Sequence, residues 1–404
     1  MIGWQKVIRR WANNNDFPTV HEDHYYAQQT TSAIKPPVWQ YFDKLGRQVA
    51  TVTQDINGDK IFSYGRYDQL GNVLATSRSS FGNSLLISDF AVTTYDKYDR
   101  PFKVKAIDGT TTSVQYDGNQ ITTTVSFDRN GQTINQKQTE NRNAFGQSLK
   151  VLDNLNGEIE YGYDVLGNLE TVTSFPNSND ETVITTTHNK MGRKVSMNDP
   201  SKGDWAYSYN ALGELLTQAD NAGQQTSNTY DPIGRQTKRV LGARTTDWTF
   251  NEHLLDTVEH TEPSESTKIQ YHYDSYGRVK QVDSTLNEQV FTQRTTYDEH
   301  GRVFQQFDAS GDSRGIRYHY RNGYVHQLQE ARDGIDGVYY QRNNSMDAFG
   351  NVVHMSQGNG VQTSKDYDRN TGYLKSIVAT TLNSDVIQDA SYEFDGIGNL
   401  LSRQ

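Results

Sequence analysis

Aromatic and aliphatic residues alternate with polar ones over short segments, and a recurring turn sequence separates these segments. In Tyr207-Ser208-Tyr209 and Tyr271-His272-Tyr273, one polar residue stands between two aromatic residues. Because successive side chains of a strand point to opposite faces, both rings of each triplet lie on one face. An apolar residue starts the next segment two positions after the turn glycine, as at Leu169 and Val279. The pattern predicts short antiparallel strands joined by tight turns.

The turn sequence consists of an aromatic residue, Asp or Asn, two variable residues, Gly, and then Arg or Asn. A clear copy is Tyr230-Asp231-Pro232-Ile233-Gly234-Arg235. The Asp side chain can accept hydrogen bonds from nearby backbone N–H groups, and Gly supplies the positive φ of a type I turn with a bulge. We therefore assign a structural turn role to these positions: Asp43, Gly46, Asp68, Gly71, Asp164, Gly167, Asn210, Gly213, Asp231, Gly234, Asp274, Gly277, Asp298, Gly301, Asp347, Gly350, Asp395 and Gly398.

A second series of turns falls about half a repeat away from the first. Its members are Asp55-Ile56-Asn57-Gly58, Asp108-Gly109, Asn156-Gly157, Asp220-Asn221-Ala222-Gly223 and Asp308-Ala309-Ser310-Gly311. These sequences predict the opposite ends of the hairpins. Some copies of the first series are less regular, since Asp99 takes the place of Gly and the turn at 250–254 has none. Each repeat of about 21 to 28 residues would supply two strands and two turns.

The number of strands constrains the shape of the sheet. About thirty strands at a spacing of about 4.8 Å make a strip on the order of 150 Å long. Such a strip must coil, split or flatten, and in one loop it would enclose a space roughly 50 Å wide. Alternating Tyr, Thr, Gln, Asn and Ser tolerate water on both faces. The sequence predicts an all-β fold, an antiparallel β-hairpin repeat array that spirals into a curved, hollow shell.

The N-terminal segment differs from the rest and is predicted to be a lead-in covering residues 1–36. Its apolar residues have helical spacing: Trp4, Val7, Ile8 and Trp11. This spacing predicts a short amphipathic helix, and its shortness favours docking on the sheet over binding to a membrane surface. Pro36-Pro37 favours an extended entry into the array. No break in composition follows, so the repeat array takes residues 37–404.

Composition narrows the function classes. Only 34% of the 404 residues are hydrophobic, which would fit a disordered chain, but the periodic placement of the apolar residues favours a fold. The formal net charge of -10 and the lack of a basic stripe argue against a nucleic-acid partner. There is no Cys for a disulfide framework. No apolar run of about 18 residues predicts a membrane span, and no classical signal peptide is present.

Catalytic, cofactor and metal sites are not predicted. His21-Glu22-Asp23-His24 groups two His with two carboxylates, but a solvated surface loop is favoured over a metal site. The segment 55–59 has its Gly in the wrong place for a calcium loop and no distal Glu. The repeated Asp residues have turn roles, so they do not indicate a catalytic pair. No Gly-rich phosphate loop occurs. We expect no enzyme activity, no cofactor and no metal.

The turn sequence resembles that of YD-repeat (RHS-repeat) proteins, over nearly all of the chain from Tyr41 to Leu401. Segments 41–47, 197–200 and 205–215 are similar to bacterial members, the RHS polymorphic toxins and the shell components of insecticidal toxin complexes; teneurins are animal relatives. The resemblance implies a hollow β-cocoon around a C-terminal toxic segment, which an aspartyl-type self-cleavage site releases. No sequence of that kind follows Phe394. We therefore expect a partial, C-terminally truncated shell, and assign cleavage and toxicity to no residue.

Two functions follow as hypotheses. The first is a non-enzymatic structural shell segment of an RHS-repeat toxin-type protein, encapsulating or carrying a C-terminal toxin or other polypeptide. Its partners would be the remainder of a larger RHS protein and its toxin cargo, and it would be secreted or at the cell surface. The alternative is an extracellular carbohydrate- or cell-surface-binding module. Its candidates for stacking on cell-surface glycans are Trp39, Trp205 and Trp248. For each of them, buried anchoring of the sheet is the favoured role.

Overall fold

The fold is built almost entirely of β-strands. The computed structural model describes residues 5–11, 24–82, 87–129, 131–155, 157–310, 314–332 and 335–404. Within these ranges there are 34 strands, one short 3-10 turn, η1 (Ile87–Asp89), and no α-helix. The prediction of an all-β fold is confirmed.

The first seventeen strands are β1 (Gln5–Trp11), β2 (Tyr26–Ser32), β3 (Val38–Phe42), β4 (Gln48–Gln54), β5 (Lys60–Tyr67), β6 (Val73–Ser77), β7 (Phe90–Tyr95), β8 (Pro101–Lys105), β9 (Thr111–Asp117), β10 (Gln120–Arg129), β11 (Gln132–Arg142), β12 (Ser148–Asp153), β13 (Glu158–Tyr163), β14 (Leu169–Ser174), β15 (Thr182–His188), β16 (Lys194–Asp199) and β17 (Gly203–Tyr209). The others are β18 (Leu215–Asp220), β19 (Gln225–Tyr230), β20 (Gln236–Leu241), β21 (Arg244–Asn251), β22 (Leu254–Glu262), β23 (Glu265–Tyr273), β24 (Val279–Leu286), β25 (Gln289–Tyr297), β26 (Val303–Phe307), β27 (Gly315–Arg321), β28 (Tyr324–Arg332), β29 (Ile335–Met346), β30 (Val352–Gln357), β31 (Gln362–Tyr367), β32 (Leu374–Thr380), β33 (Val386–Phe394) and β34 (Leu400–Arg403).

The topology is an uninterrupted antiparallel meander. Each strand pairs antiparallel with the next one in the sequence, from β1 to β34. Turns therefore lie alternately on the two long edges of one ribbon. The motif edge is the edge with the turns that link odd to even strands, such as β3 to β4. The alternate edge carries the turns that link even to odd strands.

The predicted N-terminal helix is wrong for the described residues, because Gln5–Trp11 forms strand β1. This segment pairs with β2 in a register that sets Val7 against Thr30. Val, Ile and Trp favour strands as well as amphipathic helices, and an isolated helix of this length is marginal in water. The open edge of β2 offers unpaired backbone N–H and C=O groups. Pairing with this edge gives the backbone groups of the segment their hydrogen-bond partners. Trp4 and residue 12 lie outside the described residues.

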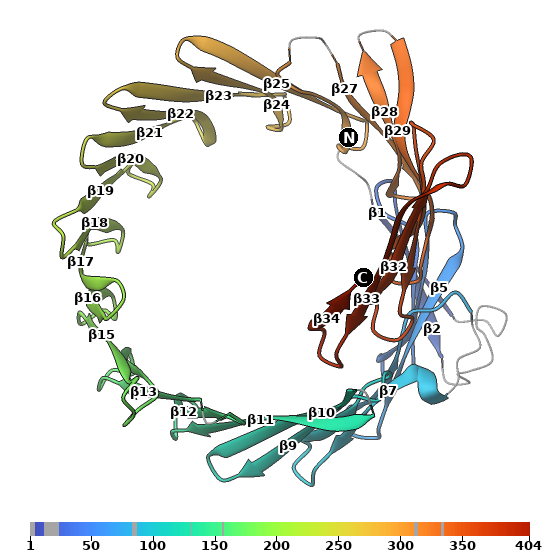
Figure 1. The fold of residues 1–404 in the computed structure, drawn as a ribbon, viewed down its shortest axis with the longest axis horizontal. Helices are drawn as coiled ribbons and strands as arrows, with labels where there is room; N and C mark the ends of the chain where they lie inside the picture. Colours follow the sequence, from blue (N-terminus) through green and yellow to red (C-terminus); the bar gives the residue numbers. More distant parts are fainter. Residues whose placement is uncertain are drawn as a thin grey trace.

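The ribbon bends into a ring rather than collapsing into a sandwich. In Figure 1 the strands surround a centre that no strand of the described chain crosses, and the first and last strands meet on one side. In the described chain, substantial contacts between strands are confined to close neighbours in the sequence. The accessible surface is 24811 Å², whereas a compact monomer of this mass would expose about 16,000 Å². The coarse prediction of a curved sheet with two solvated faces is confirmed.

Among the described residues, a hydrophobic cluster of buried side chains lies near the N-terminal end of the ribbon. The cluster comprises Ala27, Tyr41, Val49, Ala50, Val52, Phe62, Tyr64, Ala75 and Phe90, with Trp39 and Tyr67 packed against it. Just after β6, Ser80 extends the pairing alongside β5, since Phe62 and Ser80 exchange backbone hydrogen bonds in an isolated bridge. Elsewhere most side chains are half-buried or exposed, so the repeated turns contribute a large share of the order.

Candidate functional site

The repeated turn is a network of hydrogen bonds centred on its Asp. In the turn of β19 and β20, Asp231 Oδ1 accepts the backbone N–H groups of Ile233 and Arg235 at 3.0 and 2.9 Å. Asp231 Oδ2 accepts Arg235 Nε at 2.7 Å. Gly234 has φ +86° and donates its N–H to the Asp231 carbonyl oxygen at 3.0 Å. The pairing register shifts at Thr229 and Tyr230, which is a β-bulge.

The structure places the other sequence-assigned positions in the same kind of turn. Each assigned Gly has φ between +76° and +98° and donates its N–H to the carbonyl oxygen of its Asp or Asn. Where Asn follows the Gly, it takes over the role of Arg: Asn168 Nδ2 donates to Asp164 Oδ2 at 2.8 Å. Asp99, which replaces Gly, adopts φ +59°. Small polar side chains tolerate this left-handed conformation better than most.

The Arg of each turn also reaches the next repeat. Arg47 donates from its guanidinium to the Asp68 carbonyl oxygen at 2.7 Å, and its charged group lies 5.0 Å from the centre of the Tyr67 ring. Arg278 and Arg302 stand over the rings of Tyr297 and Tyr320, both at 4.2 Å. A guanidinium over an aromatic face is attracted by the ring's negative charge density. Adjacent turns are therefore linked along the motif edge.

A Tyr one position before the turn links most repeats back to the previous repeat. Tyr163 Oη donates to the Ser148 carbonyl oxygen at 2.9 Å, and Tyr209 Oη donates to that of Lys194 at 2.9 Å. The same bond is made by further tyrosines: Tyr67, Tyr95, Tyr116, Tyr230, Tyr273, Tyr297 and Tyr320. Sequence reasoning missed this ladder. Its signal was present, because the Tyr recurs one position before the Asp.

Electrostatics favour the charged form of the turn carboxylates. For Asp298, desolvation raises the pKa, but hydrogen bonds from Arg302 and from the backbone of His300, together with the Arg302 charge, outweigh it. The pKa of Asp298 therefore lies below its ordinary value. Asp43 and Asp395 show the same net lowering of the pKa. These carboxylates are structural anchors rather than proton carriers near neutral pH.

The ring closes at a seam where residues far apart in sequence meet. Asn322 Nδ2 donates to the Asp55 carbonyl oxygen at 2.5 Å, and Tyr324 Oη donates to that of Gln54 at 3.2 Å. Asn57 Nδ2 donates to the Asn344 carbonyl oxygen at 3.0 Å. Seam partners are 264 to 287 residues apart. We call residues 24–297 the first coil and residues 298–404 the second coil.

The seam always joins the two different edges of the ribbon. Arg302, on the motif edge of the second coil, donates to the carbonyl oxygen of Ala33, on the alternate edge of the first, at 3.5 Å. Further along, Thr110 Oγ1 donates to the Gly396 carbonyl oxygen at 3.4 Å. Figure 1 shows the dark red C-terminal strands and the blue N-terminal strands on the same side of the ring. The chain is therefore a spiral of somewhat more than one coil.

The seam is packed closely. Ile56, in an alternate-edge turn of the first coil, is 0% exposed and is the largest fully buried side chain of the described chain. A Cβ atom on Gly323 would lie 2.8 Å from the Lys35 Cα atom, and Gly323 has φ +84°. Both the close approach and the backbone conformation require glycine at this position. The two coils are thus in direct contact, without a layer of solvent between them.

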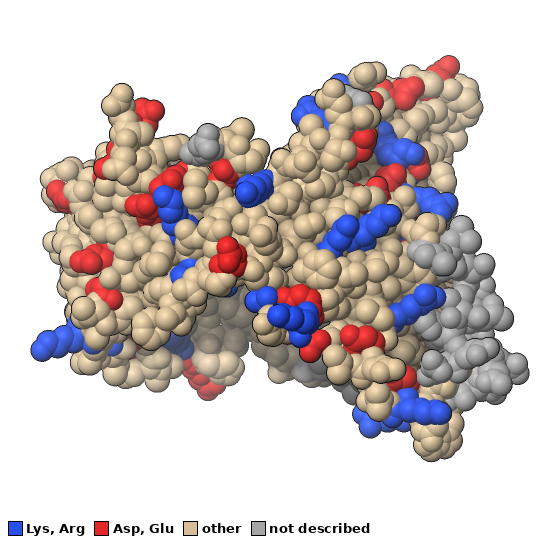
Figure 2. Space-filling model, turned by 90° about the horizontal axis from the view of Figure 1, so that it is seen from below, with Lys and Arg blue, Asp and Glu red and all other residues tan. Residues whose placement is uncertain are grey.

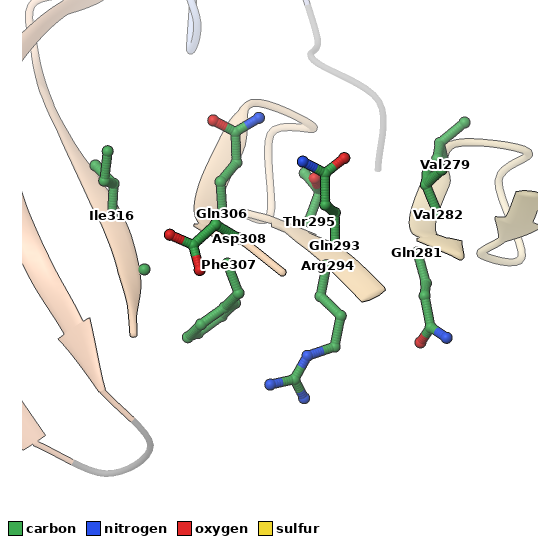
Figure 3. A pocket seen from close by; sticks show the side chains of 11 residues that line it. Val279, Gln281, Val282, Gln293, Arg294, Thr295, Gln306, Phe307, Asp308 and Ile316 are labelled. Atoms are coloured by element: carbon green, nitrogen blue, oxygen red, sulfur yellow. The ribbon is translucent and has the colours of Figure 1, made fainter. Parts of the chain in front are cut away.

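A groove in the wall of the ring lacks catalytic character. It has a volume of about 320 Å³ and lies across β24 to β27. In Figure 3, Arg294 and Phe307 project to one side of the sheet and Gln293 and Gln306 to the other. Arg294 lies 5.1 Å from the centre of the Phe307 ring. The same kind of cation–aromatic contact recurs in the turns. We therefore interpret the residues that line this groove as structural parts of the sheet.

Metal-binding clusters and membrane-spanning helices are absent among the described residues. They contain no group of three or more His, Cys, Asp or Glu side chains that could hold a metal ion. Residues 21–23 of the His-rich segment lie outside the described part. No described helix is long and apolar enough to cross a membrane. In Figure 2, Lys and Arg are interspersed with Asp and Glu over the visible face, without a continuous basic stripe.

The three tryptophans proposed for glycan stacking are half-buried. Trp39 packs against the hydrophobic cluster near the N-terminal end of the ribbon. Trp205 donates its indole N–H to the Lys202 carbonyl oxygen at 3.0 Å. Trp248 is half-buried on β21. Their positions suit anchoring of the sheet.

Comparison with known proteins gives matches in structure but not in sequence. No protein-family model matches the chain, and neither does the sequence of any curated protein. The crystal structure of TcdB2-TccC3-Cdc42 matches with a TM-score of 0.76 and 16% identity, over 93% of this chain and 22% of that chain. The structure of the Photorhabdus luminescens Tc holotoxin pore with mutation TccC3-D651A matches with a TM-score of 0.76 and 15% identity. The match covers 94% of this chain and 22% of that chain.

A crystal structure of TcdB2-TccC3 matches with a TM-score of 0.73 and 16% identity, over 98% of this chain and 24% of that chain. The chain thus spans less than a quarter of the chains that it matches. At this level of identity the likeness concerns the fold. The resemblance to toxin-complex proteins, predicted from the turn sequence, is confirmed at that level: the chain has the fold of a segment of the TcdB2-TccC3 structures.

Proposed function

We propose that the chain is a non-enzymatic structural segment of a shell of the RHS-repeat toxin type, which encloses or carries another polypeptide. The observation that carries this proposal is the seam, because a ribbon that closes on itself surrounds a space. The likeness in fold to TcdB2-TccC3 supports it. Enclosure requires only a continuous wall, so no catalytic group is needed.

The size of the space follows from the seam. Twenty-three strands, β5 to β27, separate the turn at Asp55 from the turn at Asn322. At about 4.8 Å per strand they make a perimeter on the order of 110 Å, and hence a ring about 35 Å across. This is narrower than the loop expected from all strands together, because the ribbon overlaps itself. Packed sheets lie about 10 Å apart, so the opposite walls of this ring cannot fill the centre with their own side chains.

The last hairpin is oriented in a way that suits a cargo. In Figure 1, β33 and β34 lean toward the centre of the ring, and the C-terminal end lies inside its outline. A polypeptide attached at Gln404 would therefore start on the inner side of the wall. The wall presents alternating polar residues such as the Thr and Gln of β18 and β19, which hydrogen-bond to water and adhere weakly to an unfolded chain.

Partners and location are part of the proposal. The matched structures contain TccC3, one of them together with Cdc42, and another lacks a hypervariable C-terminal region by its description. By analogy, the remainder of a larger RHS protein and a toxin cargo would be the partners of this chain. A protein of this kind would act outside the cell that makes it, as a secreted or cell-surface component. No observation favours carbohydrate binding, since the three candidate tryptophans are half-buried.

Protection of an attached peptide tests the proposal. A short unstructured peptide with one protease site would be fused after Gln404, and its cleavage would be compared with that of the free peptide. We expect cleavage to be several-fold slower in the fusion, because the wall hinders the protease. The matched control carries Arg302→Ala and Asn322→Ala, which remove seam bonds and should restore fast cleavage. Equal rates for the intact fusion and the free peptide would contradict enclosure.

A further inference from the structure

A row of apolar side chains follows the motif edge of the first coil. Each stands directly before the turn Gly, at the tip of the turn. Leu45, Leu70, Leu166, Met191, Leu212 and Ile233 are 66% to 77% exposed. Monomeric proteins rarely expose apolar side chains in a continuous row, and such rows mark interaction surfaces. We call this set the tip row.

The second coil shows what covers such tips. Phe349 and Ile397 hold the same position in their turns, and they are only 43% and 38% exposed. Both lie near seam residues, Asn344 and Gly396, which contact the alternate edge of the first coil. In the second coil, these tips near the seam are thus less exposed than the members of the tip row. The tip row of the first coil lies on the edge away from the seam, and its side chains remain exposed.

A matching surface remains open on the other side of the molecule. The seam covers the alternate edge of the first coil as far as Phe127, against which Gly396 packs. Beyond it the alternate edge is uncovered and has a groove of about 690 Å³. The groove runs past three alternate-edge turns, with Gly223, Ala243 and Pro263 among its lining residues.

Charge also suits the two surfaces to each other. The exposed Lys44, Lys97 and Lys190 stand among the tips. On the uncovered alternate edge the exposed acids Asp153, Asp180, Glu181, Glu265 and Glu288 stand beside the exposed cations Lys202 and Arg244. In the seam, a cation of the motif edge similarly meets an acid of the alternate edge, since Arg369 and Asp89 lie 3.7 Å apart.

We propose that the tip row docks on the uncovered alternate edge of a second copy of this chain, so that copies stack head to tail as further coils. The contact joins two different surfaces, so each added copy leaves one of each free and growth does not stop at a dimer. The proposal rests on the seam and the two open edges and requires no cargo. Its failure would leave the peptide-protection result unaffected.

Sedimentation velocity over a range of concentrations tests the stacking. The wild-type chain should rise above 45.9 kDa as concentration increases, through dimers to larger species. A tip variant, Leu166→Asn, Leu212→Asn and Ile233→Asn, should stay monomeric. Because these side chains are exposed in the monomer, its circular dichroism should match that of the wild type. Tyr340→Asn, which changes an exposed mid-strand residue, should associate like the wild type.

A second variant makes the test independent of the first. Ala243→Arg places a large charged side chain in the groove and should also give a monomer. Each variant keeps one intact surface, so mixing the two should produce a 1:1 dimer that grows no further. A wild-type chain that stays monomeric or stops at a dimer would overturn the proposal. A mixture of the two folded variants that stays monomeric would overturn it as well.

Discussion

At the scale of single residues, the fold depends on a few positions that repeat the same chemistry. The turn Asp gathers backbone N–H groups, the Gly allows the left-handed backbone, and Tyr and Arg bond to neighbouring repeats. These roles need particular side chains but little burial, which explains how a chain with only 34% hydrophobic residues can be ordered. Each role makes a prediction that a single substitution can check.

The turn glycine is tested best where space is open. Gly71 has φ +97°, and an added Cβ would meet nothing within 4 Å, so Gly71→Ala isolates the backbone cost. We expect the free energy of unfolding to fall by about 1 kcal/mol, the typical cost of a left-handed residue with a Cβ. The reverse change, Asp99→Gly, should not destabilise the chain. Urea unfolding of both variants measures this, and a neutral Gly71→Ala would contradict the turn geometry.

The tyrosine ladder has a matched control within one strand. Tyr163→Phe removes the hydroxyl that donates to the Ser148 carbonyl oxygen, and one such bond contributes about 1 kcal/mol. Tyr161→Phe removes a hydroxyl from the same face of β13 that forms no hydrogen bond within the described residues. We expect the urea midpoint to fall for Tyr163→Phe and to stay unchanged for Tyr161→Phe. Equal shifts would show that the ladder bond is not the cause.

The turn carboxylates predict loss of stability in acid. The pKa values of Asp43, Asp298 and Asp395 are lower in the folded chain than their ordinary value. Their contribution is therefore complete above the unfolded-state pKa, near 4, and is lost as the pH falls through the lower folded-state values. Unfolding free energy should be level between about pH 7 and 5 and decline below about 4. Stability that rises on acidification below pH 4 would contradict this.

At the scale of elements, local sequence predicts the hairpins because each turn is decided within about six residues. The Asp231–Gly234 turn needs no distant contact, and its strands follow from the alternation beside it. The segment Gln5–Trp11 behaves differently. Its apolar spacing fits a helix equally well, and only the open edge of β2 decides for a strand. The error arose because pairing with a neighbour outweighed a local pattern.

At the scale of the whole molecule, sequence patterns indicate that the ribbon must curve but not where it closes. The seam joins residues 264 to 287 positions apart. No sequence feature around Asn322 or Asp55 identifies these two residues as hydrogen-bond partners. Their meeting depends on the summed twist and bend of more than twenty strands, so small differences in each strand would move the closure point. The width of the ring and the two open edges follow from that closure.

Closure of the ring is the central claim, and distances between spin labels test it most directly. The chain has no cysteine, so two spin labels can be attached at chosen sites through two introduced cysteines. Double electron–electron resonance then measures the distance between the labels. Lys35→Cys with Arg321→Cys spans the seam, and Lys190→Cys with Arg321→Cys spans the ring. We predict a short distance for the first pair, below about 20 Å, and about 35 Å or more for the second, from the perimeter of the ring. A long distance for the first pair, or equal distances for both, would contradict a ribbon that coils back onto its own start.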